Sequence, residues 1–495
     1  MELINLIQDQ IELHKHKYSS TDVTGIYNDA RKVTANSVFI AIKGNKLDGH
    51  TFIPQAIAQG AIMLVVEDRQ HVPADFEGIV YFVKDTRETQ DLLAAKFYRN
   101  PGNEMFCIGV TGTNGKTSTS YMIECLLNQN GLPTGVIGTV NHHLLDQVWP
   151  TDMTTPDSVG LQKRLRDFRD AGAKAVVMEV SSHALDQKRV HSVPFDTVVF
   201  TNLTRDHLDY HKSMELYFQA KEKLFTEVMW KSNKAHTTAV VNIADPYGRK
   251  IKIAEPVHVW TYGTDESDFQ VEIIDMSFTQ TEFLLKTSEA EVHFRLPMSG
   301  QHNVQNAIAA IAVALSAGVR LEDCAHSLQS FKGVPGRLQS VPNEKDISVF
   351  VDYAHSPDAI ENVLLSLIEV RKSFQSKAKI WTIFGCGGDR DKGKRPLMAQ
   401  AAFKYSDEVM VTSDNPRSED PQQIIHDILI GVSDEQKKRL QVEVDRRLAI
   451  EQVIRQAKKG DVILIAGKGH EAYQIIGQEV LPFCDYQVAL EVLKN

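Results

Sequence analysis

The sequence predicts an α/β fold built on parallel sheets. Short apolar segments rich in valine and isoleucine recur along the chain, and each is followed by a polar or glycine-rich loop and then by a helical pattern. Apolar runs of this kind are typical of parallel strands buried on both faces. The chain has 495 residues, which is too long for one hydrophobic core, so two or three domains are expected.

Two breaks in this pattern divide the chain into three predicted parts. "YRNPGNE" at 98–104 precedes a glycine-rich loop, and "FKGVPGR" at 331–337 follows a long helical stretch. We therefore expect a smaller N-terminal α/β domain at 1–100, a central parallel-sheet domain with a phosphate loop at 101–333, and a C-terminal Rossmann-like α/β domain at 334–495.

The two larger parts each contain four clear strand patterns. Unusual polar residues follow these patterns, at the strand ends where open parallel sheets bind ligands. The predicted strands of the central part are "EMFCIGV", "KAVVMEV", "DTVVFTNL" and "TAVVNIA", and those of the C-terminal part are "ISVFVDY", "KIWTIFG", "DEVMVTS" and "DVILIAG".

Composition excludes several classes of protein. The net charge is -10 and no long block of lysine and arginine occurs, which argues against nucleic-acid binding. The five cysteines include no CxxC pair, so neither a disulfide framework nor a zinc ribbon is indicated. No apolar run approaches the ~20 residues of a membrane span, and the start lacks a secretory pattern. We expect a reduced, cytoplasmic protein.

The segment "TGTNGKT" at 111–117 predicts a nucleotide site. In a phosphate loop, backbone N–H groups and a helix N-terminus face phosphate oxygens, lysine reaches the outer phosphates, and a hydroxyl binds Mg²⁺. The usual first glycine is displaced, because Val110 stands five residues before Gly115, but the strand, loop and helix context is right. The predicted nucleotide contacts are Gly112, Thr113, Asn114, Gly115, Lys116, Thr117 and Ser118.

This loop with its altered spacing resembles that of the Mur ligases, the ATP-dependent amide-forming enzymes of peptidoglycan precursor synthesis. Further segments resemble, in order, the member that adds the third residue of the stem peptide: "MEVSSHAL", "TNLTRDHLDYH", "GQHNVQNAIAA", "GVPGRLQ", "VDYAHSPDA", "FGCGGDRDKGKRPLM", "DNPR" and "AGKGHE".

The resemblance implies an acid–amino-acid ligase that uses ATP and Mg²⁺. It would add meso-diaminopimelate to the γ-carboxylate of D-glutamate in UDP-MurNAc-L-Ala-D-Glu, through an acyl phosphate. The three parts would bind, in order, the UDP-sugar, ATP and the amino acid. We expect a monomer whose partners are these small molecules.

The resemblance also implies a metal and catalytic set around the phosphate loop. Lys116 would neutralise charge on the transferring phosphate. Glu179 and His207 each follow a predicted strand, and with Thr117 they would hold Mg²⁺. Lys221 matches a lysine that is carbamylated in the family, which would turn a cation into an anion and so give a further metal ligand. Lys116, His207 and Lys221 are the predicted catalytic residues.

Three further sets of contacts are implied in the same way. The segment that is expected to bind uridine departs from the family pattern at two places, at Ala30 and over 44–49. The predicted contacts are Asn28, Asn45 and Lys46 for uridine, Thr154, Thr155, Ser181, Gln187 and Arg189 for the rest of the UDP-linked substrate, and Asn303, Arg337, Asp352 and His355 for adenine and phosphate.

The residues of the predicted amino-acid site indicate which amino acid is added. Diaminopimelate carries a second carboxylate that lysine lacks, and a guanidinium can grip a carboxylate through two bonds. "TSDNPRSEDP" supplies Arg417 directly after a strand, and "GGDRDKGKRP" supplies Arg390. The predicted site adds Asp414, Asn415 and Pro416, which shape the loop, and Gly467 and Glu471, which would receive the backbone and the distal ammonium.

Three alternatives stay open from the sequence. The same ligase could add L-lysine, although an unpaired Arg417 would repel it. A folylpolyglutamate synthetase-like ligase would share the central architecture but should lack "DNPR" and the sugar-nucleotide segment. A non-catalytic ATP-binding regulator would bind nucleotide without phosphate release, and it would leave Glu179, His207 and Lys221 unexplained.

Overall fold

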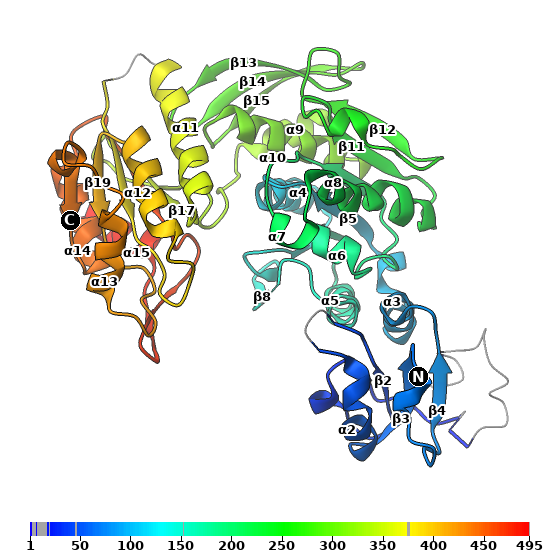
Figure 1. Cartoon of the computed structure of the whole chain (residues 1–495). Coiled ribbons are helices and arrows are strands. Elements are labelled where there is room, and N and C mark those ends of the chain that lie inside the picture. Colours follow the sequence, from blue (N-terminus) through cyan, green and yellow to red (C-terminus); the bar gives the residue numbers. More distant parts are fainter. Residues whose placement is uncertain are drawn as a thin grey trace. The chain divides into compact units, whose positions relative to one another are not determined.

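The fold is the α/β class that the sequence predicts. The computed structural model describes residues 1, 6, 17–18, 20–44, 47–151, 153–373 and 377–494. They form two compact units, Met1–Gln270 with Ile308–Cys324, and Val271–Ala307 with Ala325–Asn495. The predicted parallel sheets are confirmed, with three such sheets in the described chain (Figure 1). The three-part division into 1–100, 101–333 and 334–495 stays a prediction.

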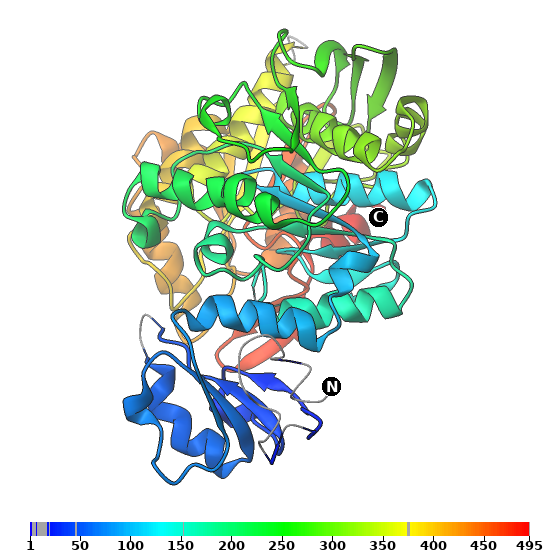
Figure 2. The ribbon, with the colours of Figure 1, turned by 90° about the vertical axis from the view of Figure 1, so that its right-hand side faces the viewer.

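The N-terminal sheet of the first unit is a four-stranded parallel sheet in the order β1-β2-β3-β4. Alternate residues of β2 and β3 fill two separate hydrophobic clusters, because successive side chains of a strand point to opposite faces. Helix α2 contributes to one cluster and α3 to the other, so the sheet is covered on both faces (Figure 2). The bounds are β1 (Ile26–Tyr27), β2 (Ser37–Ile40), β3 (Ala61–Val66), β4 (Ile79–Phe82), α2 (Ile53–Ala58) and α3 (Thr86–Phe97).

The central sheet has eight strands in the order β12-β11-β10-β5-β9-β6-β7-β8. Its first six strands pair in parallel, and β7 and β8 are added through antiparallel pairs. Strand β5 lies between β10 and β9, so the loops after these three strands emerge side by side. The bounds are β5 (Phe106–Thr111), β6 (Thr134–Ile137), β7 (His142–Leu144), β8 (Gln147–Trp149), β9 (Ala175–Glu179), β10 (Thr197–Phe200), β11 (Thr238–Asn242) and β12 (His258–Tyr262).

The helices of the central region begin where the sequence supplies a cap or a permissive residue. Asp157 caps α5 by accepting a hydrogen bond from the Gly160 N–H, and Ser213 caps α8 in the same way. Helix α5 packs beside α3 and carries part of the main buried cluster (Figure 1). The bounds are α4 (Lys116–Gln129), α5 (Ser158–Asp170), α6 (Ser182–Asp186), α7 (Leu208–His211) and α8 (Met214–Lys223).

The second unit is built on a six-stranded sheet in the order β16-β17-β21-β18-β19-β20. All of its strands are parallel except the edge strand β16. Helices α11, α12 and α13 cover one face, and α14 and α15 cover the other (Figure 1). The bounds are β16 (Gln339–Val341), β17 (Ser348–Asp352), β18 (Ile380–Phe384), β19 (Glu408–Val411), β20 (Leu440–Val442), β21 (Val462–Ala466), α11 (Pro357–Ser373), α12 (Lys394–Tyr405), α13 (Pro421–Leu429), α14 (Arg446–Gln456) and α15 (Asp485–Lys494).

Two smaller sheets complete the described structure. One is a three-stranded sheet in the order β13-β14-β15, and the other is the antiparallel hairpin β22-β23. Helices α9 and α10 each contain residues of both units. Across the described residues, no helix combines the length and the apolar character needed to cross a membrane. The bounds are β13 (Gln270–Met276), β14 (Thr281–Lys286), β15 (Glu291–Leu296), β22 (Tyr473–Ile476), β23 (Glu479–Pro482), α9 (Gln301–Ser316) and α10 (Leu321–Leu328).

Candidate active site

The glycine-rich loop after β5 is held by the segment that follows the neighbouring strand β10. The backbone N–H of Thr113 donates to the Asn202 carbonyl at 2.9 Å, and the N–H of Asn114 donates to the Asn202 side-chain oxygen at 2.9 Å. The Thr201 hydroxyl donates to the Asn114 carbonyl at 2.6 Å. These hydrogen bonds brace the loop, and a braced loop loses less entropy when it binds a ligand.

Gly112 is required by both backbone and space. Its φ is 148°, and a Cβ at this position would lie 1.9 Å from the Thr201 hydroxyl oxygen. Gly115 also has a positive φ and caps α4 without a side chain, so the helix begins at Lys116 directly after the loop. A helix N-terminus at the end of such a loop favours phosphate oxygens. The loop geometry thus fits the predicted nucleotide site.

Two lysines meet at one carbonyl of this loop. The Lys116 ammonium donates to the carbonyls of Gly112 and Thr113 at 2.9 and 2.8 Å. Lys221, from α8, donates to the same Gly112 carbonyl at 2.8 Å and is only 2% exposed. Burial, and then the nearby charge of Lys116, hold the pKa of Lys221 well below its usual value. The structure therefore brings these two predicted catalytic lysines together.

Glu179, at the end of β9, anchors a second group of predicted residues. Its two carboxylate oxygens accept hydrogen bonds from the N–H and the hydroxyl of Thr139 at 3.0 and 2.9 Å. The Thr139 and Thr154 hydroxyls lie 3.0 Å apart. The Thr155 hydroxyl donates to the Glu179 carbonyl at 2.8 Å and contacts the Ser181 hydroxyl at 3.3 Å. Predicted substrate residues and the predicted metal ligand thus form one connected network.

Arg189 extends this network. Its guanidinium donates to the Thr155 carbonyl and to the Gln187 side-chain oxygen, both at 2.8 Å. Burial lowers the pKa of Arg189. Asn28 donates to Asp157, the cap of α5, at 3.2 Å, which links the N-terminal sheet region to this part of the first unit. Two other predicted uridine contacts, Asn45 and Lys46, lie outside the described residues.

The predicted metal ligands follow three adjacent strands. Thr117 follows β5, Glu179 ends β9 and His207 follows β10. The His207 side chain is 47% exposed, and its ring stands edge-on to His183 with 5.1 Å between centroids. The described residues include no group of three or more histidine, cysteine, aspartate or glutamate side chains placed to hold a metal ion.

The predicted adenine and phosphate contacts belong to the second unit. The Arg337 guanidinium lies over the Tyr353 ring, 5.2 Å from its centroid, and its buried Nε has no hydrogen-bond partner in the described structure. Asp352 accepts hydrogen bonds from two backbone N–H groups at 2.6 and 2.8 Å, and its pKa is raised by burial. The His355 ring stands edge-on to the Tyr353 ring, with 4.6 Å between their centroids. Asn303 is buried in α9, where it donates to the Ser299 carbonyl at 2.7 Å.

The predicted amino-acid site gathers at the ends of β19 and β21. The Asn415 amide donates to Glu471 at 2.8 Å, which joins the loops after the two strands. Gly467 has a φ of 119°, and a Cβ there would lie 2.7 Å from the Asp414 carboxylate, so the close approach of these loops needs glycine. Asp414, Asn415 and Pro416 are all buried, and burial raises the pKa of Asp414.

The two predicted carboxylate-binding arginines lie beside one glycine. Arg417 has a φ of 52°, and its backbone N–H donates to the Ile475 carbonyl of β22 at 3.0 Å. Its guanidinium donates to the Gly388 carbonyl at 2.9 Å. A Cβ placed on Gly387 would lie 3.0 Å from the Arg417 guanidinium and 3.7 Å from the Arg390 side chain. The loops after β18 and β19 therefore bring the Arg417 guanidinium and the aliphatic part of Arg390 to the same glycine.

Sequence reasoning missed several residues that shape these sites. Lys468 is fully buried between Asn415 and Glu471, at 3.0 and 3.1 Å. Its only signal is its place between two glycines directly after a buried strand. Arg446 and Asp485 form a fully buried ion pair at 2.7 Å, and Arg446 also donates to the carbonyls just before Asp414 and Gly467. No local sequence pattern predicts an ion pair between residues this far apart in the chain.

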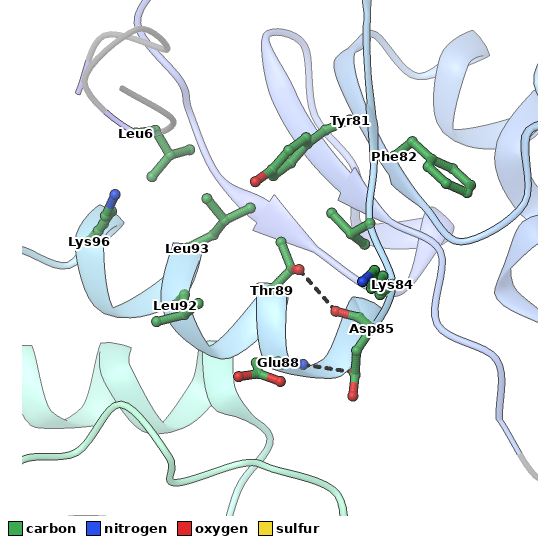
Figure 3. Close-up of a pocket in the computed structure, with 11 residues that line it drawn as sticks. Leu6, Tyr81, Phe82, Lys84, Asp85, Glu88, Thr89, Leu92, Leu93 and Lys96 are labelled. Carbon is green, nitrogen blue, oxygen red and sulfur yellow. Dashed lines mark hydrogen bonds between the residues drawn. The ribbon is translucent and has the colours of Figure 1, made fainter. Parts of the chain in front are cut away.

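A cavity of about 440 Å³ lies elsewhere in the first unit, along β4 and α3 (Figure 3). The start of α3 beside it is capped by Asp85, which accepts a hydrogen bond from the Glu88 N–H at 3.0 Å. The described residues that line the cavity, such as Tyr81, Phe82 and Leu92, include none of the predicted site residues. This cavity is separate from the phosphate loop.

The fold and the loop define a phosphate-loop α/β protein built to bind a nucleoside triphosphate. Three family models match the chain: "Mur ligase family, catalytic domain" at 22–98, "Mur ligase middle domain" at 110–314 and "Mur ligase, glutamate ligase domain" at 336–469. The chain therefore belongs to the Mur ligase family, as the sequence motifs predict.

Individual relatives agree with this assignment. The UDP-N-acetylmuramoyl-L-alanyl-D-glutamate--2,6-diaminopimelate ligase of Geobacillus kaustophilus is 42% identical over 497 residues, which covers 100% of each chain. A solved structure of a ligase with the same name has a TM-score of 0.73 and 32% identity, covering 100% of this chain and 99% of that one. A folylpolyglutamate synthase of Mycobacterium tuberculosis, solved with ADP and AMPPCP, has a TM-score of 0.60 at 17% identity, covering 77% and 92%, and this likeness shows the fold alone.

Proposed function

We propose that the protein is an ATP-dependent ligase that joins meso-2,6-diaminopimelate to the γ-carboxylate of D-glutamate in UDP-MurNAc-L-Ala-D-Glu, in peptidoglycan precursor synthesis. The observation that carries the proposal is the 42% identity to a 2,6-diaminopimelate ligase over the full length of both chains. The arginine and carboxylate groups at the ends of β18, β19 and β21 support the same substrate.

The reaction proceeds in two steps. The γ-carboxylate of D-glutamate attacks the γ-phosphorus of ATP, ADP leaves, and an acyl phosphate forms. The amine of diaminopimelate then attacks the acyl carbon, phosphate leaves with the bonding electron pair, and the amine loses a proton to complete the amide. Lys116 offsets the negative charge that would otherwise keep the two anionic reactants apart. Most of the catalysis is positioning and charge stabilisation.

The nucleotide-binding residues fit this role. The braced loop 112–115 and the start of α4 favour phosphate oxygens. Thr117 and Glu179 supply a hydroxyl and a carboxylate, which are donor types that Mg²⁺ takes together with phosphate and water oxygens. When bound, the ion supplies Lewis-acid stabilisation of phosphate charge. In the second unit, the buried Arg337 Nε has no hydrogen-bond partner in the described structure.

Lys221 is proposed to act as its carbamate. Burial and the charge of Lys116 lower the pKa of Lys221, which increases the share of neutral amine, and only the neutral amine can attack carbon dioxide. The new N–C bond forms as the amine releases one proton, which leaves an anionic carboxylate on the lysine. An anion at this place would relieve the repulsion between Lys221 and Lys116. It would also add an oxygen ligand beside the phosphate loop.

Diaminopimelate fits the amino-acid site better than L-lysine does. The Arg417 guanidinium is available to the substrate's distal carboxylate, with Arg390 on the neighbouring loop, and the Glu471 carboxylate is available to the distal ammonium. L-Lysine would present no carboxylate to Arg417. We also propose that the protein is a cytoplasmic monomer whose partners are these small molecules.

The experiment that tests the proposal is phosphate release by the purified protein. ATP, Mg²⁺ and UDP-MurNAc-L-Ala-D-Glu are supplied with each of a panel of amino acids, and the product is identified by its mass. Phosphate release that depends on meso-diaminopimelate is the expected result. Release with none of the amino acids would overturn the proposal and favour a nucleotide-binding regulator.

A further inference from the structure

We propose that Lys468 is a positioning residue of the amino-acid site, whose buried ammonium fixes Asn415 and the Glu471 carboxylate and thereby sets the KM for the incoming diamino acid. This inference rests on the proposed function. It concerns a residue to which no sequence motif assigns a role. Lys468 follows β21 by two residues, between Gly467 and Gly469. Its side chain is 0% exposed, so it acts on the substrate only through other residues.

The contacts of Lys468 join two loops across the sheet edge. Its ammonium donates to the Asn415 side-chain oxygen at 3.0 Å and to Glu471 Oε2 at 3.1 Å. Asn415 also donates to Glu471 Oε2 at 2.8 Å, so the three side chains form a closed triangle. In strand order β18 separates β19 from β21, so the triangle spans the end of β18. Arg417 lies only two residues beyond Asn415, on the loop that this triangle holds.

The triangle uses one carboxylate oxygen of Glu471 and leaves the other without a hydrogen bond in the described structure. Both hydrogen bonds go to Oε2, and Oε1 makes none within the described structure. A carboxylate fixed in this way can accept a hydrogen bond from a substrate ammonium without first giving up a protein partner. Lys468 therefore pre-organises the acceptor, while remaining out of contact with the substrate.

The charges around Lys468 show why a cation is needed here. Asp414 and Glu471 are two carboxylates in one pocket, and Lys468 Nζ lies 4.0 Å from Asp414 and 3.1 Å from Glu471. Burial raises the pKa of Asp414, and Arg446 and Lys468 are the cations that oppose this rise. Asp485 is paired with Arg446, and the Tyr473 ring covers Lys468 at 5.6 Å. Without Lys468, like charges would face one another with only Arg446 near them.

A purely structural role is the competing reading. A buried lysine paired with a carboxylate can serve folding alone, and breaking such a pair is costly wherever it occurs. The two readings differ in the steady-state constants, because a positioning residue changes the KM for diaminopimelate while leaving nucleotide binding unaffected. They also differ in coupling, because a positioning residue loses its effect when Glu471 is already altered.

The test compares Lys468→Met with Lys468→Gln in the full chain. Met keeps the length and removes both charge and donors, whereas Gln keeps a donor and removes the charge. Lys459→Met is the matched control, because Lys459 is exposed and pairs with Asp346 on the surface. Each protein is assayed for the KM of meso-diaminopimelate, for kcat, for the Kd of ADP and for Tm.

Lys468→Met should raise the KM for meso-diaminopimelate on the order of 10- to 100-fold, with kcat within about threefold and the Kd of ADP unchanged. Lys468→Gln should give a smaller rise, and Lys459→Met none. Adding Lys468→Met to Glu471→Gln should change KM much less than Lys468→Met does alone.

Two results would overturn the inference. One is a wild-type KM in a Lys468→Met protein that binds ADP and melts normally. The other is loss of folding in both variants, which would make Lys468 a folding residue only. Failure of the proposed function has a separate signature, because the wild-type protein would then not turn over meso-diaminopimelate.

Discussion

Lys221 in the first unit and Lys468 in the second are buried to the same degree, 2% and 0% exposed, but they have opposite partners. Lys221 donates to the Gly112 carbonyl beside another lysine, whereas Lys468 donates to the Glu471 carboxylate. Burial penalises an ammonium unless an anion lies near it. The first lysine is therefore suited to react as a neutral amine, and the second to hold a carboxylate in place. The partner, rather than burial, decides the chemistry.

Lys221→Ala tests the reactive side of this comparison and should have the largest effect. Loss of the proposed carbamate should lower kcat on the order of 10²- to 10³-fold, because an oxygen ligand for Mg²⁺ beside the phosphate loop is lost. Lys223→Ala is the control, since Lys223 lies on the same helix and pairs with Asp186. Steady-state assays in bicarbonate buffer measure both.

Intact-mass measurement gives a second view of Lys221. The wild-type protein in bicarbonate should carry the mass of one added carbon dioxide, and Lys221→Ala should not. Near-normal turnover by Lys221→Ala would break the comparison, because the neutral lysine would then have no role in the reaction.

Arg417→Ala extends the comparison from Lys221 to a cation that stays charged. Like Lys221, Arg417 donates to a backbone carbonyl, but a guanidinium keeps its charge. It should therefore bind the distal carboxylate of diaminopimelate, and its loss should lower kcat/KM by roughly a hundredfold or more. The Kd of ADP should not change. Arg447→Ala, which removes an arginine paired with Glu491 on the surface, should leave both constants near wild type.

Asp91 extends the comparison to a buried acid. It lies on α3, is 1% exposed, and neither carboxylate oxygen has a hydrogen-bond partner in the described structure. Burial raises the pKa of Asp91 to about 7, and the nearby Ser192 only partly opposes the shift. The folded state therefore binds more protons than the unfolded state between about pH 4 and pH 7, so the wild-type protein loses stability from this group as pH rises through that window.

Asp91→Asn should remove this dependence. The variant should be more stable than the wild type by a few kcal/mol at pH 8 and about equal to it at pH 4. Thermal unfolding at the two pH values measures the difference, with the exposed Asp146→Asn as the control. An equal Tm difference at both pH values would show that Asp91 does not titrate in this window.

Local motifs made much of the candidate site predictable. Short motifs whose residue types indicate a ligand occur at 112–118 and around Asn415, Arg417 and Glu471. Apolar runs predict the strands before them. The sequence pattern does not state which distant segments meet. The bracing of the loop by Asn202 and the burial of Lys468 depend on strand order, which only the structure gives.

The pairing of buried charged residues could not be predicted from the sequence either. Arg446 and Asp485 are 39 residues apart and fully buried, and as sequence they look like ordinary helix residues. The two lysines at the Gly112 carbonyl are likewise 105 positions apart, so the lowered pKa of Lys221 could not be derived without coordinates. The resemblance to the family points to Lys221, and the structure adds the burial and the neighbouring Lys116 that lower its pKa.

The most direct test of the proposed activity is a competition between two amino acids in one reaction. The wild-type protein is supplied with ATP, Mg²⁺, UDP-MurNAc-L-Ala-D-Glu and equal concentrations of meso-diaminopimelate and L-lysine, and the UDP-linked products are separated by mass. Arg417 and Glu471 predict that the diaminopimelate product exceeds the lysine product by on the order of a hundredfold or more. Equal amounts of the two products, or an excess of the lysine product, would contradict the assignment.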